Sequence, residues 1–81
     1  ADLRNIARYI AEDNPRAAIR VIARIEQSIR LLASFPKLGR VGAVKNTREL
    51  VIPRLPYRII YREEQKAVFI LNIIHTSRNW P

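Results

Sequence analysis

The chain has 81 residues and a formal net charge of +8, so it fits one small domain, residues 1–81, with a modest core. With no Cys and a single His it has no disulfide and no metal site built from thiolates or several imidazoles, and two glycines are too few for a P-loop. The longest apolar run, Ala67 to Leu71, is far shorter than a membrane span or a signal-peptide core. We therefore expect a cytoplasmic protein with no membrane partner, metal or cofactor.

The excess of positive charge is spread along the whole chain. Fifteen basic residues oppose seven acidic ones, and twelve of the fifteen are Arg. Arginine binds phosphates and carboxylates through a planar fork, which favours an anionic partner such as RNA, DNA or an acidic protein segment. A solvated surface in an Arg-rich composition explains the same count, and the charge alone leaves both interpretations open.

The first half of the chain has the apolar spacing of two helices. Residues 1–13 carry apolar side chains at helical spacing, and residues 15–34 repeat the pattern over a longer stretch. Asn14-Pro15 separates them, since Asn is a good N-cap and Pro is preferred at the first helical position. Phe35-Pro36 ends the second helix, because the residue before Pro avoids helical dihedral angles. The short joint predicts an antiparallel helical hairpin.

The second half changes to a period of two after an irregular segment, residues 36–47. Strands are expected at Arg48–Ile52, Tyr57–Arg62 and Ala67–Ile74, with a polar hairpin turn at residues 63–66. The third strand is apolar on both faces, so we expect it to be central in the sheet. Helices followed by antiparallel strands predict an α+β fold, with the hairpin packed on one face of a small, mainly antiparallel sheet.

Four segments in this order resemble the RelE/ParE superfamily of toxins from bacterial type II toxin–antitoxin modules, formerly called plasmid-stabilisation proteins. The likeness covers nearly the whole chain. The segments are F-P-K-L-G-R at 35–40, T-R-E-L-V-I-P at 47–53, P-Y-R-I-I-Y-R at 56–62 and I-L-N-I-I-H-T-S-R-N-W-P at 70–81. Members of that family usually begin with a β-strand before the first helix, and the first family strand is absent from this chain. If the molecule itself lacks that strand, one sheet edge is unpaired, and such an edge invites association.

The resemblance implies a toxin that arrests growth and is neutralised by a cognate antitoxin. One branch of the family inhibits DNA gyrase, and the other cleaves mRNA on the ribosome. The ribonuclease branch is typically rich in Lys and Arg on the strand before the P/G-Y-R segment, whereas here Arg48–Ile52 contains no lysine. This favours gyrase inhibition, with the ribosome-dependent endoribonuclease as the alternative, so whether the chain is an enzyme stays open. A plain nucleic-acid-binding domain is disfavoured, because no known reader motif is present.

The resemblance and the residue chemistry together select the candidate site residues. For a ribonuclease these are Arg58, His75 and Arg78, because an imidazole is the side chain best suited to act as base or acid at physiological pH and arginines hold phosphate. Tyr57 or Tyr61 would then add a hydroxyl or a stacking face, although their strand spacing favours packing in the core or at its rim. The wider set for a nucleic acid or protein target is Arg48, Arg58, Arg62 and Arg78. At the end of an apolar strand His75 is more often a hydrogen-bonded boundary residue, and Arg58 and Arg62 also fit a solvated sheet face.

The expected antitoxin offers an acidic, partly disordered segment that folds on binding. Three apolar residues lie off the main stripe of the helical hairpin and are candidates for its docking site: Ile19, Leu31 and Phe35. Either a homodimer or a toxin–antitoxin hetero-oligomer is compatible with this chain.

Overall fold

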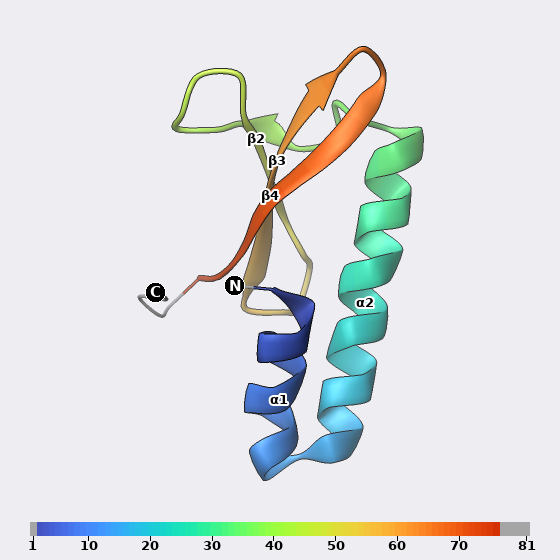
Figure 1. Ribbon diagram of the computed structural model, residues 1–81, viewed down its shortest axis with the longest axis vertical. Helices are drawn as coiled ribbons and strands as arrows, with labels where there is room; N and C mark the ends of the chain where they lie inside the picture. Colours follow the sequence, from blue (N-terminus) through green and yellow to red (C-terminus); the bar gives the residue numbers. More distant parts are fainter. Residues whose placement is uncertain (1, 77–81) are drawn as a thin grey trace.

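The computed structural model describes residues 2–76, which form two helices followed by an antiparallel sheet (Figure 1). The sheet of residues 2–76 has the strand order β1-β2-β3-β4, so β2 and β3 are its inner strands and β1 and β4 are its edges. Figure 1 shows α2 running beside the sheet, while the far end of the helical hairpin extends beyond it. The elements are α1 (Leu3–Asp13), α2 (Pro15–Ser34), β1 (Arg40–Val41), β2 (Arg48–Val51), β3 (Tyr57–Glu64) and β4 (Ala67–His75).

Local capping explains where the helices begin and end. The Asp2 carboxylate accepts a hydrogen bond from the Asn5 N–H at 2.9 Å, and this bond lowers the pKa of Asp2. Asn14 serves both helices. Its N–H donates to the Ile10 carbonyl at 2.9 Å at the end of α1, and its side chain accepts from the Ala17 N–H at 3.1 Å at the start of α2. One residue therefore makes the joint of the hairpin.

The core lies between the helices and one face of the sheet. The helices contribute Ile6, Ile25 and Leu32 to it, and the sheet and its connections contribute Ile52, Tyr57, Ile59, Tyr61 and Ile73. Alternation along the strands places these residues on one side and leaves the opposite face of the sheet open. Neither helix in residues 2–76 is long and apolar enough to cross a membrane.

The predicted α+β architecture and the antiparallel helical hairpin are confirmed, and two details of the sheet differ from the prediction. The two-residue strand β1 lies in the segment expected to be irregular, because a strand so short carries no period. The expectation that Ala67–Ile74 is central is wrong, since β4 is the edge strand of the sheet in residues 2–76. Its second apolar row is not buried: Phe69 and Leu71 remain 44% and 47% exposed.

Candidate functional site

The open face of the sheet carries two of the predicted site residues, Arg58 and Arg62. Arg58 and Arg62 alternate with the buried residues of β3 and therefore point away from the helices. Across the strands, Arg58 pairs with Val51 of β2 and Ile74 of β4, and Arg62 pairs with Phe69. This face thus combines cations with half-exposed apolar side chains.

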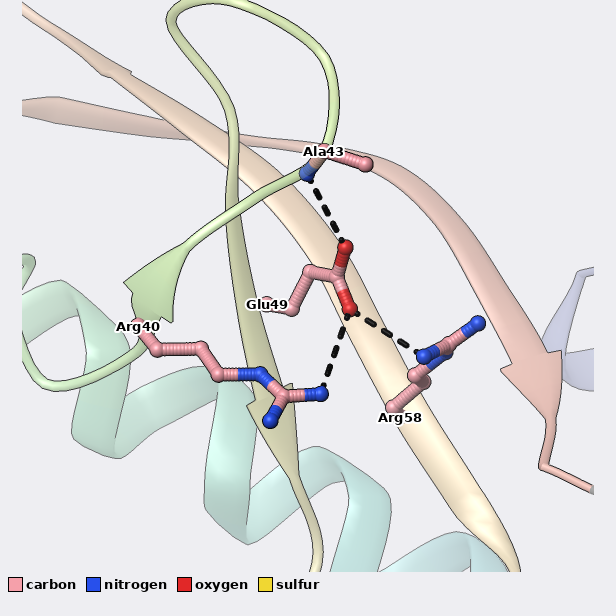
Figure 2. Close-up of polar contacts among 4 residues, drawn as sticks. All are labelled: Arg40, Ala43, Glu49 and Arg58. Carbon is pink, nitrogen blue, oxygen red and sulfur yellow. Dashed lines mark hydrogen bonds and ion pairs between the residues drawn. The ribbon is translucent and has the colours of Figure 1, made fainter.

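Glu49 of β2 holds two arginines on the open face. One of its carboxylate oxygens lies 3.2 Å from Nη1 of Arg58 and 3.8 Å from Nη2 of Arg40, and the other accepts from the Ala43 N–H at 3.4 Å. Figure 2 shows Arg40 and Arg58 approaching that carboxylate from two strands. The Glu49 side chain is only 13% exposed, so the interaction with Arg58 is better shielded than an ordinary surface ion pair.

Arg58 is therefore already partly neutralised inside the chain. Its Nε is buried and has no hydrogen-bond partner among residues 2–76, while Nη1 faces Glu49. A phosphate would have to compete with the carboxylate for the guanidinium group. The spacing of Glu49 from Arg58 in the sequence gives no hint of this contact, which depends on the register of β2 against β3.

Arg62 and Arg48 also have partners within the chain. Nε of Arg62 lies 2.6 Å from the Glu64 carboxylate, and its guanidinium carbon is 5.3 Å from the centre of the Phe69 ring. Arg48 pairs with Tyr61 on the face toward the helices, and its Nη1 donates to the Gly39 carbonyl at 2.7 Å. Arg48 thus lies on the opposite face from Arg58 and Arg62.

His75 lies away from Arg58. It is the cross-strand partner of Tyr57, and the two rings meet edge to face with centroids 5.1 Å apart. Tyr57 is buried, and burial raises the pKa of its hydroxyl. Arg78 lies outside the described residues. The described ribonuclease candidates, Arg58 and His75, therefore occupy opposite faces of the sheet.

Tyr61 is a structural residue rather than a stacking platform. Its ring is fully buried, and its hydroxyl accepts from the Gly39 N–H at 2.8 Å and donates to the Pro36 carbonyl at 2.7 Å. These bonds hold the segment that joins α2 to the sheet. The suggestion that Tyr57 or Tyr61 stacks on a base is wrong, because both rings are in the core.

The apolar residues proposed from the helical hairpin are exposed. Ile19, Leu31 and Phe35 are 72%, 45% and 60% exposed, and the neighbouring Leu38 is 48% exposed. Ile19 borders a groove between α1 and α2, whereas Leu31 lies about 18 Å farther along α2, at 1.5 Å per residue. The three residues therefore belong to two separate surface patches: Ile19 lies at the α1–α2 groove, and Leu31 and Phe35 lie at the C-terminal end of α2.

Metal chemistry has no visible support in the described part of the chain. Residues 2–76 contain no group of three or more His, Asp or Glu side chains able to hold a metal ion. The candidate functional features are thus charge, exposed apolar side chains and the Glu49-centred ion pairs.

Comparisons with known proteins agree on one family. The family model described as the ParE toxin of the type II toxin–antitoxin system parDE matches residues 1–80. The Sinorhizobium fredii protein named "Putative toxin Y4kP" is 46% identical over 98% of this chain and 81% of its own length. Toxin RelE2 of Caulobacter vibrioides is 38% identical over 96% of this chain and 86% of its own. A chain from the solved chromosomal ParDE system of P. aeruginosa superposes with a TM-score of 0.79 at 25% identity, covering 94% of this chain and 85% of that one.

Proposed function

Because the chain belongs to the ParE toxin family of type II toxin–antitoxin systems, we propose that it arrests growth in the cytoplasm by inhibiting DNA gyrase, without turning over a substrate. Its cognate antitoxin then acts by covering the toxin. The second candidate function is the ribosome-dependent endoribonuclease activity that the resemblance to the RelE/ParE superfamily also implies, and one similar protein carries the name Toxin RelE2.

The separation of the candidate catalytic groups is the observation that carries the proposal. Cleavage through a 2′-hydroxyl needs a base, an acid and a cation around one phosphate. Arg58 faces the open side of the sheet and is held by Glu49, whereas His75 packs on Tyr57 at the other face. The two tyrosines of β3, Tyr57 and Tyr61, are both buried, and the Tyr61 hydroxyl is doubly hydrogen bonded. This arrangement supports binding to a target better than general acid–base catalysis.

His75→Ala separates the two functions by the size of its effect. Removing a general acid or base costs about 10²–10⁴-fold in rate, whereas a residue that only packs at a strand end changes target inhibition by about twofold or less. We expect the full-length protein to block gyrase supercoiling and its His75→Ala variant to do so nearly as well, with circular dichroism confirming the fold. Mapping mRNA 5′ ends on translating ribosomes provides the parallel measurement. Cleavage within codons that disappears in His75→Ala and Arg58→Ala would contradict the gyrase proposal.

We further propose that the antitoxin covers the exposed apolar residues of α2 and its C-terminal end. Leu31 and Phe35 lie on the same end of α2 and leave a large apolar area in water. An acidic amphipathic segment would bury these side chains while a carboxylate meets Lys37, which lies beside Phe35.

Phe35→Glu tests this surface. Loss of a central aromatic anchor typically costs 2 kcal/mol or more in binding, so we expect the affinity for the cognate antitoxin to fall by about 30-fold or more, measured by titration calorimetry. Phe69→Glu is the matched control, because Phe69 is also a half-exposed aromatic residue but lies on the open face of the sheet. If Phe69→Glu weakens binding more than Phe35→Glu does, the antitoxin covers the sheet face and the proposed surface is wrong.

A further inference from the structure

The outward face of α2 carries four arginines that have no carboxylate partner among residues 2–76. The sheet arginines Arg40, Arg58 and Arg62 all form ion pairs, but no ion pair engages an arginine of α2 among residues 2–76. The four arginines of this helix, here called the α2 arginine face, are Arg16, Arg20, Arg24 and Arg30. Among the described helices and strands, α2 thus holds four of the six arginines that have no carboxylate partner, the other two being Arg8 of α1 and Arg48 of β2.

Helical geometry places these arginines along one side of α2. Ala18, Ile25 and Leu32 define the buried side, and at 100° per residue all four arginines fall on the exposed half. Arg16, Arg20 and Arg24 follow one another at four-residue steps, about 6 Å of rise each, and Arg30 extends the row to about 21 Å. The helix backbone therefore fixes the spacing of the row before any ligand arrives.

A groove of about 640 Å³ runs beside this row, between α2 and the turn that follows β2. Arg20, Arg24 and Arg30 line it together with Gln27, and Val21 and Leu55 supply apolar lining. Nη2 of Arg24 donates to the Pro53 carbonyl at 2.7 Å, which fixes one guanidinium group at the border and leaves its other donors available. No carboxylate lines the groove, and Glu26, the only acidic residue of α2, lies in the separate groove facing α1.

We propose that the α2 arginine face binds the phosphate backbone of duplex DNA. Guanidinium forks bind phosphate oxygens in pairs, and a row of about 21 Å spans roughly six phosphates of one strand at 3.4 Å each. An acidic protein partner fits less well, because protein interfaces depend on large apolar anchors at their centre. None of the exposed large apolar side chains of residues 2–76 lines this groove. This property of the free chain does not depend on gyrase being the target.

Salt dependence of DNA binding tests the proposal. The full-length protein is titrated into a fluorescently labelled 20-base-pair duplex at 50 to 200 mM salt, and anisotropy gives the affinity. Four phosphate contacts predict a slope of log K against log salt of about −3.6, which lowers the affinity by roughly 100-fold over this range. The variant Arg16→Gln/Arg20→Gln/Arg30→Gln should reduce the slope to about −1, because each lost contact removes about 0.9. Gln and Arg have similar helix propensities, so α2 is retained.

A charge-matched variant distinguishes the helix from the net charge. Lys37→Gln/Lys45→Gln/Lys66→Gln removes three exposed cations from loops and should leave the slope close to that of the parent protein. An equal loss of slope in the lysine variant would show that only overall charge matters and would overturn the proposal. Tighter binding of a poly-glutamate peptide than of the duplex, lost in the arginine variant, would assign the face to an acidic protein and would also overturn it.

Discussion

Tyr61→Phe is expected to lower the free energy of unfolding by about 2–4 kcal/mol, although it removes a single oxygen atom. The hydroxyl bonds to the Gly39 N–H and the Pro36 carbonyl at 2.8 and 2.7 Å, and Gly39 is itself buried. Removing the hydroxyl leaves a donor and an acceptor without partners in a shielded place, which costs about 1–3 kcal/mol for each unsatisfied group. Urea unfolding followed by circular dichroism measures the loss.

Tyr57→Phe provides the control for this result. Tyr57 is nearly as well buried as Tyr61 and lies on the same face of β3, but its hydroxyl forms no hydrogen bond to any of residues 2–76. We expect its replacement to cost about 1 kcal/mol or less. Equal effects of the two substitutions would show that the Tyr61 hydroxyl does not stabilise the segment between α2 and β1. Because that segment follows Phe35, Tyr61→Phe should also weaken antitoxin binding through the proposed surface.

The same segment tolerates little added volume. A Cβ at Gly39 would lie 2.8 Å from the Glu49 carbonyl oxygen and 2.7 Å from the Tyr61 hydroxyl, both closer than normal contact. The F-P-K-L-G-R segment of the family resemblance thus corresponds to a place where backbone, tyrosine ring and strand meet. The motif identified the segment correctly, but the packing that explains its glycine became visible only in three dimensions.

Local signals made the helices and most strands predictable from the sequence. Asn14-Pro15 and Phe35-Pro36 marked helix ends because capping and Pro sterics act over neighbouring residues, and strand alternation identified β3. The position of β4 was not predictable from its pattern. Its two apolar rows are equally consistent with a central strand and with an edge strand that keeps Phe69 and Leu71 half exposed.

The candidate site depended on contacts that the sequence does not encode locally. Arg58 was identified from its motif, but Glu49 was not, since their meeting requires both the strand register and the loop that brings Ala43 to the carboxylate. In the sequence, the arginines of α2 are only part of a positive charge that is spread along the whole chain. Their significance appeared when the arginines of the sheet proved to be paired within the chain.

Ile25→Ala should have the other large effect, a loss of about 2–5 kcal/mol in the free energy of unfolding. Ile25 is fully buried at the centre of α2, where it packs in the cluster that joins the helices to the sheet. The deletion leaves a cavity in a core that cannot close over it without moving α2 from the sheet. An 81-residue domain has only about 4–12 kcal/mol of stability, so the variant is expected to be close to its threshold and to melt more than about 10 °C lower.

Ile19→Ala is the matched control, because it makes the same change in the same helix at a side chain that is 72% exposed. Its stability should change by about 0.5 kcal/mol or less, and similar melting temperatures of the two variants would refute the packing of α2 on the sheet. The antitoxin adds a second readout. A partner that binds only the folded toxin stabilises it by about 2.7 kcal/mol at 100 times its Kd, so Ile25→Ala should recover much of its melting temperature in the complex. If Ile25→Ala loses toxicity and its melting temperature rises again in the complex with the antitoxin, the loss of toxicity is an effect on folding. His75→Ala and the α2 arginine variants are expected to keep the fold, so their effects report on the surface.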